Sequence, residues 1–168
     1  VMGFFLLLIF GVNQPIGSFF LNVLGVRIAF SFSATVIAAV VISFPIMYRS
    51  ARGALEQVDE DLVAAARTLG MSETSIFFKI LVPNALPGII SGGVLSFARG
   101  LGEFGATAML AGNIVGKTRT LPLAVYGEVV SSDMHSASFY VVVIIAICFT
   151  AVILLNIYQL WVKKKRGY

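Results

Sequence analysis

Residues 139–162, FYVVVIIAICFTAVILLNIYQLWV, are the stretch that decides the class of this protein. These 24 residues carry no charged side chain, and they end near Tyr158 and Trp161, aromatic residues typical of the membrane–water interface. An α-helix rises about 1.5 Å per residue, so about 20 apolar residues cross a bilayer core about 30 Å thick. The stretch therefore predicts a membrane-spanning helix.

Two other stretches predict spans of the same kind. Residues 28–48 hold 21 uncharged residues, and 19 more lie between Lys79 and Arg99. The second stretch contains two prolines and a Gly-Gly pair, so we expect it to be bent. Residues 1–12 are apolar but short and lack the basic region of a signal peptide. Because the chain opens on valine, we interpret them as the remainder of a span whose beginning is missing.

The composition excludes several other classes of protein. Hydrophobic residues make up 58% of the 168 residues and charged residues 12%, whereas soluble domains carry about 25% charged residues. One cysteine and one histidine argue against a disulfide framework and a zinc site, and a net charge of +4 is small for a nucleic-acid binder. We predict an all-α polytopic membrane helix bundle in the lipid bilayer, a single domain over residues 1–168.

The lysines and arginines predict the orientation of this bundle. Eight of the 12 fall in residues 49–83 or in the tail 163–166. Such residues are enriched in cytoplasmic loops, so we expect residues 49–83 and the C-terminus to lie in the cytoplasm. Residues 102–138 then lie outside, and within them residues 104–116 are too short to cross and are expected to be re-entrant or to line a cavity.

Residues 49–83 predict a helix, a glycine turn and a second helix. Gly70 suits the left-handed conformation that ends a helix, Ser72 suits a helix N-cap, and Pro83 is expected to limit the second helix. Such an elbow fits either a docking surface or an amphipathic loop on the lipid headgroups. Its first helix carries an apolar stripe at helical spacing, formed by Leu55, Val58, Leu62, Ala65, Ala66 and Leu69.

The spacing of small residues in this elbow resembles the EAA motif of ABC importer permeases. That family pattern is Glu-Ala-Ala, Gly, Ile and Leu-Pro at fixed intervals, and here Ala64 replaces Glu and Val82 replaces Leu. The resemblance implies a coupling helix that docks in a cleft on a separate ATP-hydrolysing subunit. The residues that match the motif are Ala64, Ala65, Ala66, Gly70, Ile80 and Pro83.

A second set of residues narrows the resemblance to the molybdate permease subfamily, of which sulfate/thiosulfate and tungstate permeases are close relatives. The similar stretches are FARGLGEFGAT at 97–107, Asn113-Ile114 and TRTLP at 118–122. The resemblance implies a multi-pass protein of the cell (inner or plasma) membrane that pairs with a second copy of itself. It further implies two cytoplasmic ATPase subunits, which hold the ATP, and an extracytoplasmic oxyanion-binding protein. No cofactor is expected on this chain itself.

The outer end of the third predicted span holds the candidates for a translocation path or gate. Arg99 and Glu103 stand four residues apart, which fits either a functional site or a mutually neutralising pair that fixes a bend. We interpret the pair as shaping the path rather than binding the anion, because a carboxylate is a poor ligand for an oxyanion. Gly102 and Gly105 allow close backbone approach, and Thr107 either lines the path or bonds its own backbone.

Residues 111–118, AGNIVGKT, come close to a phosphate-binding loop, but no strand is expected before them, so we reject nucleotide binding. Lys117 and Arg119 instead predict an external basic loop that either meets a binding protein or is solvated.

No arrangement of residues predicts catalysis, so the chain is expected to be a transporter subunit and not an enzyme. The alternatives are an autonomous ion-coupled carrier or channel, which would need paired intramembrane charges, and a membrane anchor or assembly protein.

Overall fold

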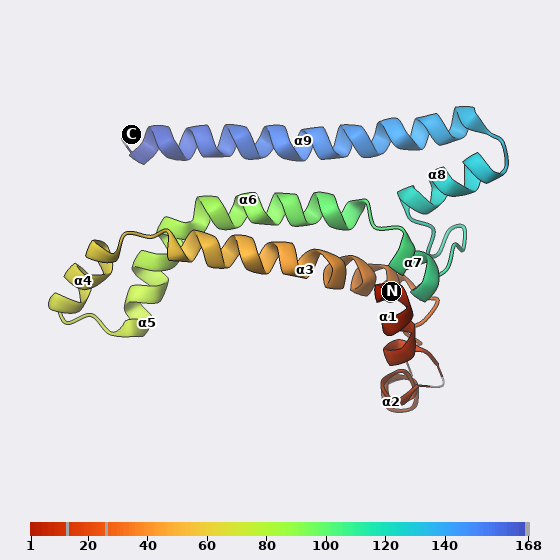
Figure 1. The fold of residues 1–168 in the computed structure, drawn as a ribbon, viewed down its shortest axis with the longest axis horizontal. Helices are drawn as coiled ribbons and strands as arrows, with labels where there is room; N and C mark the ends of the chain where they lie inside the picture. The colour runs from red at the N-terminus through yellow and green to blue at the C-terminus, as the bar shows by residue number, and fades with distance from the viewer. Residues whose placement is uncertain (13, 26, 167–168) are drawn as a thin grey trace. The chain divides into compact units, whose positions relative to one another are not determined.

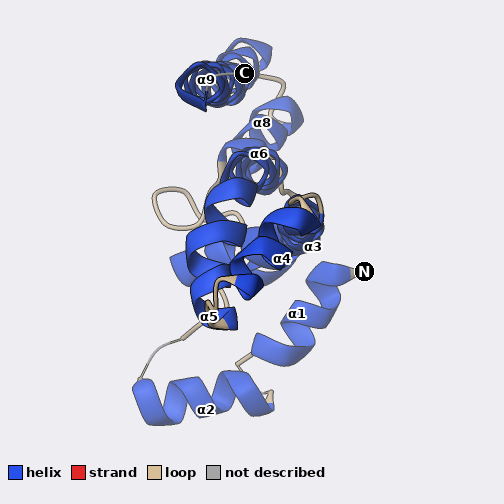
Figure 2. Cartoon of the chain, turned by 90° about the vertical axis from the view of Figure 1, so that its left-hand side faces the viewer, coloured by secondary structure: helices blue, strands red, loops and turns tan. Residues whose placement is uncertain are grey.

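The computed structural model describes residues 1–12, 14–25 and 27–166, and all the regular elements of these residues are helical (Figure 1, Figure 2). This confirms the predicted all-α class. In chain order the elements are α1 (Met2–Phe10), α2 (Pro15–Leu24), α3 (Phe32–Glu56), α4 (Glu60–Thr68), α5 (Glu73–Ile76), the π-helical segment η1 (Phe77–Leu81), α6 (Val82–Leu101), α7 (Gly105–Leu110), α8 (Leu121–Val130) and α9 (Met134–Arg166).

Three helical runs of the described chain are long and apolar enough to cross a membrane: Phe32–Glu56, Glu73–Leu101 and Met134–Trp161. They confirm the three predicted spans, although the ends of the helices differ from the prediction. α3 begins later than residue 28 because Phe30 has a φ of 58° and the Ser31 hydroxyl accepts a hydrogen bond from the Ala34 N–H. It runs on past residue 48 because charged residues end an apolar run without ending a helix.

The prediction of one helix through the stripe from Leu55 to Leu69 is wrong. Leu55 belongs to α3, which ends at Glu56, and α4 starts after a break. Asp59 makes this break, because its carboxylate accepts a hydrogen bond from the Asp61 N–H at 2.9 Å and so caps α4. The stripe is therefore divided between two helices.

The prediction that Pro83 limits the second helix is also wrong, because the helical run continues from α5 through η1 into α6. A proline ring ordinarily clashes with the carbonyl four residues earlier. Here the preceding turn is a π-turn, in which the Val82 N–H bonds the carbonyl of Phe77, five residues back. The Ile80 carbonyl also accepts a hydrogen bond from the Asn84 side chain at 2.8 Å. The wider turn thus accommodates Pro83 inside the helix.

The described chain forms two compact units, and the first comprises Val1–Ser43 and Phe97–Phe149. In this unit α1 packs on α7 so closely that a Cβ added to Gly3 would lie 2.8 Å from the Cα of Ala106. α7 is a six-residue helix and is too short to cross a bilayer, in agreement with the expectation for residues 104–116. The buried core of the unit consists of Leu6, Ala34, Ala38, Ala106, Leu110 and Ala111.

The second unit comprises Phe44–Ser96 and the chain from Thr150 onward. In it α3 and α6 run side by side (Figure 1), and small residues face each other along their contact. A Cβ added to Gly88 would lie 2.7 Å from the Cβ of Ala54, and one added to Gly92 would collide with the Cβ of Ser50. The two backbones therefore approach closely only because these positions lack larger side chains.

The last span is joined to α6 within this second unit. The side-chain amide of Gln159 donates a hydrogen bond to the Ser91 hydroxyl, which in turn donates to the Pro87 carbonyl at 2.8 Å. An interhelical hydrogen bond of this kind helps to orient one span against another.

Replacing Gly92 with alanine should destabilise the protein, because the new methyl group overlaps the Cβ of Ser50. We expect the free energy of unfolding to fall by about 1–3 kcal/mol, as for other overpacked contacts. Thermal unfolding of the purified protein in detergent micelles measures the change.

Gly93 provides the matched control, since a Cβ at this position meets nothing within 4 Å. Gly93→Ala should leave the stability unchanged or raise it by up to about 1 kcal/mol, because alanine favours the helix. The double variant Ser50→Gly with Gly92→Ala should recover stability relative to Gly92→Ala. Equal effects of alanine at positions 92 and 93 would contradict the close contact.

Candidate functional site

The elbow, residues 49–83, turns back on itself at Gly70. Gly70 has a φ of 74°, and a Cβ at this position would meet nothing within 4 Å. The need for glycine is therefore conformational and not steric. The turn is closed by a 3.1 Å hydrogen bond from the Met71 N–H to the Ala66 carbonyl. This confirms the predicted left-handed end of the first elbow helix.

A solvent-exposed ion pair bridges the two helices of the elbow on either side of this turn. Arg67 donates from Nε to Glu73 Oε1 at 2.8 Å and from Nη2 to Oε2 at 3.1 Å. The hydrogen bonds with Glu73 raise the pKa of the Arg67 guanidinium. Ser72 caps α5, as predicted, by accepting a hydrogen bond from the Ser75 N–H. Ile76 is fully buried beneath the turn, so the elbow has a small core of its own.

The apolar stripe of α4 is not covered by the rest of the described chain. Leu62 is 47% exposed and Leu69 is 81% exposed. Of the three alanines in the motif, Ala64 and Ala65 are exposed and only Ala66 is buried. Exposed apolar residues on a rigid, charged helix are typical of a surface that docks against another protein.

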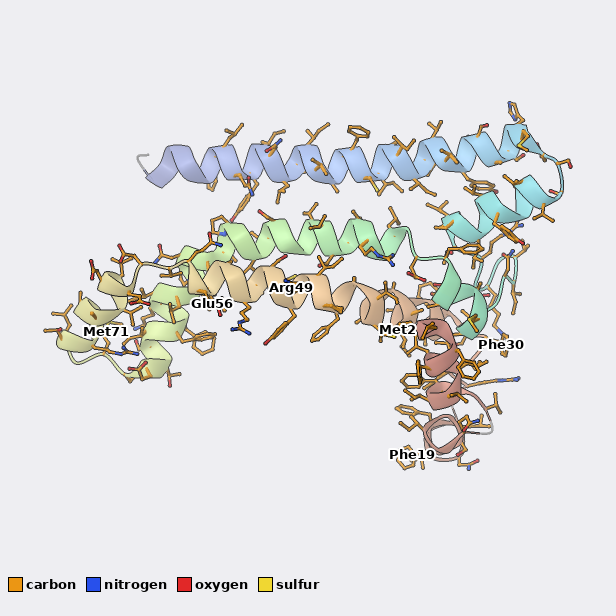
Figure 3. All side chains as sticks on the ribbon, in the orientation of Figure 1. Met2, Phe19, Phe30, Arg49, Glu56 and Met71 are labelled. Carbon is orange, nitrogen blue, oxygen red and sulfur yellow. The ribbon has the colours of Figure 1, made fainter. Side chains whose placement is uncertain are left out.

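The remaining motif residues lie at the base of the elbow. Ile80 is half-buried in the π-turn, and Pro83 is exposed at the start of α6. A cleft of about 720 Å³ lies between the end of α3, α4 and η1. Its charged lining consists of Glu56, Glu60, Asp61 and Arg67. The elbow thus offers a mainly acidic cleft, and Glu56, at one edge of it, is labelled in Figure 3.

The second group of predicted residues lies where α6 ends. Glu103 is buried, at 7% exposure, and its carboxylate has two partners. Its Oε2 atom lies 3.1 Å from Arg99 Nη1, and its Oε1 atom accepts a 2.9 Å hydrogen bond from the Ala106 N–H at the start of α7. The carboxylate is therefore committed to joining two helices. This geometry favours the interpretation that the pair fixes a bend.

The structure places the other candidates for the path in different environments. Gly102 and Gly105 are exposed on either side of Glu103, whereas Thr107 is buried at 1% exposure. Thr107 lies on α7, which packs against α1, so it belongs to the interior of the first unit. Assigning these residues to a translocation path stays a prediction.

Residues 111–119 form a compact loop between α7 and α8. The Ile114 carbonyl accepts hydrogen bonds from the N–H groups of Lys117, Thr118 and Arg119. The element before the loop is a helix where a phosphate-binding loop needs a strand.

Of the two alternatives for the basic loop, the structure disfavours a solvated Arg119, because this side chain is paired. Its Nη1 atom lies 3.1 Å from Glu128 on α8, and its Nε atom donates to Asn113 at 3.2 Å. Arg119 and Glu128 are only 23% and 20% exposed. Lys117 remains exposed. Glu128 was missed because nine residues separate it from Arg119, a spacing that no helical pattern indicates.

Comparison with known proteins gives a consistent family assignment. The family described as "Binding-protein-dependent transport system inner membrane component" matches residues 1–167. The chain is 51% identical over 126 residues to the molybdenum transport system permease protein ModB of Escherichia coli, covering 75% of this chain and 55% of that protein. It is 41% identical over 147 residues to ModB of Mycobacterium tuberculosis, covering 87% of this chain and 55% of that protein.

A sulfate relative is more distant. The sulfate transport system permease protein CysW of Synechocystis is 34% identical over 159 residues, covering 95% of this chain and 57% of that protein. The chain spans between 55% and 66% of the length of the first curated relatives that it matches.

Replacing Glu103 with alanine should lower stability, because it leaves the Ala106 N–H and one side of Arg99 without their partner. Loss of a buried acceptor costs about 1–3 kcal/mol, which should appear as a lower midpoint of thermal unfolding in detergent.

The pair Arg52–Glu56 is the matched control, because it has the same spacing but side chains 63% and 60% exposed. Glu56→Ala should leave the unfolding midpoint unchanged, since exposed pairs contribute little. If Glu103→Ala impaired transport without lowering the midpoint, Glu103 would line a path and would not brace the bend.

Proposed function

Because the chain belongs to the family of binding-protein-dependent transport system inner membrane components, we propose that it is the membrane-spanning permease subunit of an ABC importer for molybdate. The higher identity to molybdenum permeases, 51% and 41% against 34% for the sulfate relative, supports this choice of anion. Sulfate or thiosulfate and tungstate are the alternative substrates. The chain itself binds no cofactor in this proposal, and ATP is hydrolysed on a partner subunit.

The exposed face of α4 is the observation that carries this proposal. Leu62 and Leu69 are exposed, and Ala64, Ala65 and Gly70 of the EAA motif lie close to them in the sequence. Because these side chains find no cover in the described chain, they are suited to a cleft on another protein. We assign that cleft to a cytoplasmic ATPase subunit, one for each of two copies of this permease.

The elbow and the C-terminus lie on the cytoplasmic side in this proposal. The count of lysines and arginines supports it, and so does the grouping of the chain from Thr150 onward with residues 44–96. The side chains of residues 163–166, which include four of the counted charges, lie outside the described residues. The opposite surface then faces an extracytoplasmic protein that delivers the oxyanion.

The helical run from the elbow suggests how motion would reach the membrane. From Glu73 to Ser96, within the second unit, the chain is helical without a break, so we expect a displacement of the elbow to move this part of the span. ATP-driven closure of the two ATPases would draw the elbows together and switch the spans between inward-facing and outward-facing states. The bend braced by Glu103 would then be a candidate gate, together with Gly102, Gly105 and Thr107.

A rival in a different class is an autonomous carrier or channel. It would need ionisable pairs inside the membrane to couple or gate an ion. In the described spans the pair Arg99–Glu103 is the nearest candidate, and its carboxylate is already engaged by the α7 backbone. This engagement supports the importer over the carrier.

Replacing Leu69 with glutamate should abolish ATPase docking, because it puts a charge into the apolar centre of the proposed contact. Central interface residues contribute about 2 kcal/mol or more, so we expect the copurified ATPase to fall by at least about tenfold, with a similar loss of ATP-dependent uptake. The measurement is the ATPase retained by the tagged, full-length permease.

Val115, in the loop between α7 and α8, supplies the control, because it is also an exposed aliphatic residue at 72% exposure. Val115→Glu should retain the ATPase fully. Undiminished retention by the Leu69 variant would refute the coupling role of α4.

The substrate assignment predicts a selective loss of molybdenum. Cells that lack the complete gene should accumulate less molybdenum at limiting molybdate while sulfate uptake stays normal, and the full-length gene should restore accumulation. Elemental analysis and labelled sulfate measure the two, and excess tungstate tests competition. Normal molybdenum content in a strain without a second importer would instead favour sulfate or another anion.

A further inference from the structure

Helix α2 presents an apolar face that the described chain leaves uncovered. Ile16, Phe19 and Val23 are 44%, 58% and 62% exposed. Their spacing of three and four residues places them on one side of the helix. Elsewhere on the helix Gly17 is buried against the backbone carbonyls of Phe10 and Gly11, so α2 is held firmly to the end of α1. Its exposed face is therefore fixed in direction.

The direction of α2 differs from that of α3, the span that follows it in the chain. α2 is seen end-on where α3 is seen from the side (Figure 1), and the reverse holds after a quarter turn (Figure 2). Helix α2 and the first part of α3 belong to the same compact unit. α2 ends at Leu24 and α3 starts at Phe32, so only a short connection separates them. A helix that runs across the direction of a span, a few residues before the span begins, suits the plane where the bilayer meets water.

The lack of charge around this face favours lipid as its cover. Residues 1–26 contain no charged side chain, and the first charge is the exposed Arg27. A protein partner that recognises charge has nothing to bind on α2, whereas lipid accepts phenylalanine and aliphatic side chains at the boundary of headgroups and acyl chains. Phe32, at the adjacent end of α3, is 70% exposed, so the apolar surface continues onto the span.

We propose that α2 is an interfacial anchor that lies in the membrane surface, with Ile16, Phe19 and Val23 inserted among the upper acyl chains of the lipid. The inference requires only that the chain spans a membrane, so it stands or falls independently of the transported anion. It assigns α2 a lipid contact in place of a protein contact.

Fluorescence of a single tryptophan tests this placement. The chain has one tryptophan, Trp161, so Trp161→Phe provides the background and Phe19→Trp the probe. The full-length protein is reconstituted in phosphatidylcholine vesicles whose acyl chains carry bromine near the carbonyl end or near the methyl end. Shallow bromine should quench the probe at least about twofold more than deep bromine, because such helices insert only about 5–10 Å.

Lys117→Trp in the same background is the control, because Lys117 is exposed in the compact loop. Its fluorescence should be quenched by aqueous acrylamide and little by either brominated lipid. Val23→Trp provides a second probe if the Phe19 variant does not fold. Quenching of the α2 probes by acrylamide alone would place the face in water, and quenching by neither agent would place it against protein. Either result overturns the proposal.

Discussion

The structure depends on one constraint: inside a bilayer, every backbone N–H and carbonyl must find a partner within the protein. Unbroken helix satisfies this over most of the three spans. Where the helix is disturbed, two side chains add hydrogen bonds to the backbone. The Asn84 side chain bonds the Ile80 carbonyl next to Pro83, and Glu103 accepts a hydrogen bond from the Ala106 N–H where α6 ends. These polar side chains thus support the backbone at the points where the regular helix is interrupted.

The same requirement explains the contrast between the elbow and the bend at Glu103. In the elbow the ion pair Arg67–Glu73 beside the turn at Gly70 is exposed, so water screens its charges. At the end of α6 the brace is a carboxylate almost wholly removed from water. The elbow can therefore keep its apolar side chains for a partner, whereas the bend uses its polar groups internally.

Much of this architecture could be predicted from the sequence, because hydropathy identifies spans and turn chemistry identifies Gly70 and Ser72. The ends of the helices could not, since a charged residue such as Arg52 leaves an apolar run but continues a helix. The effect of Pro83 could not be predicted, because proline breaks a regular α-helix but fits after a π-turn, and the sequence pattern does not indicate the π-turn. The short helices α2 and α8 are not predicted, because each has only ten residues and is too short for a span. The pair Arg119–Glu128 depends on the path of a compact loop, which no local pattern encodes.

The contact of Gly88 and Gly92 with α3 has a mechanical consequence. Two helices separated by long side chains can roll or slide, because rotamer changes absorb the displacement. Here the short side chains of Ser50 and Ala54 pack directly on the backbone of Gly92 and Gly88, so no long, flexible side chain separates the helices at these positions. We therefore expect α3 and α6 to move together as one stiff pair along this contact. The stiffness comes from the missing side chains of Gly88 and Gly92, because their absence lets the two helices pack closely.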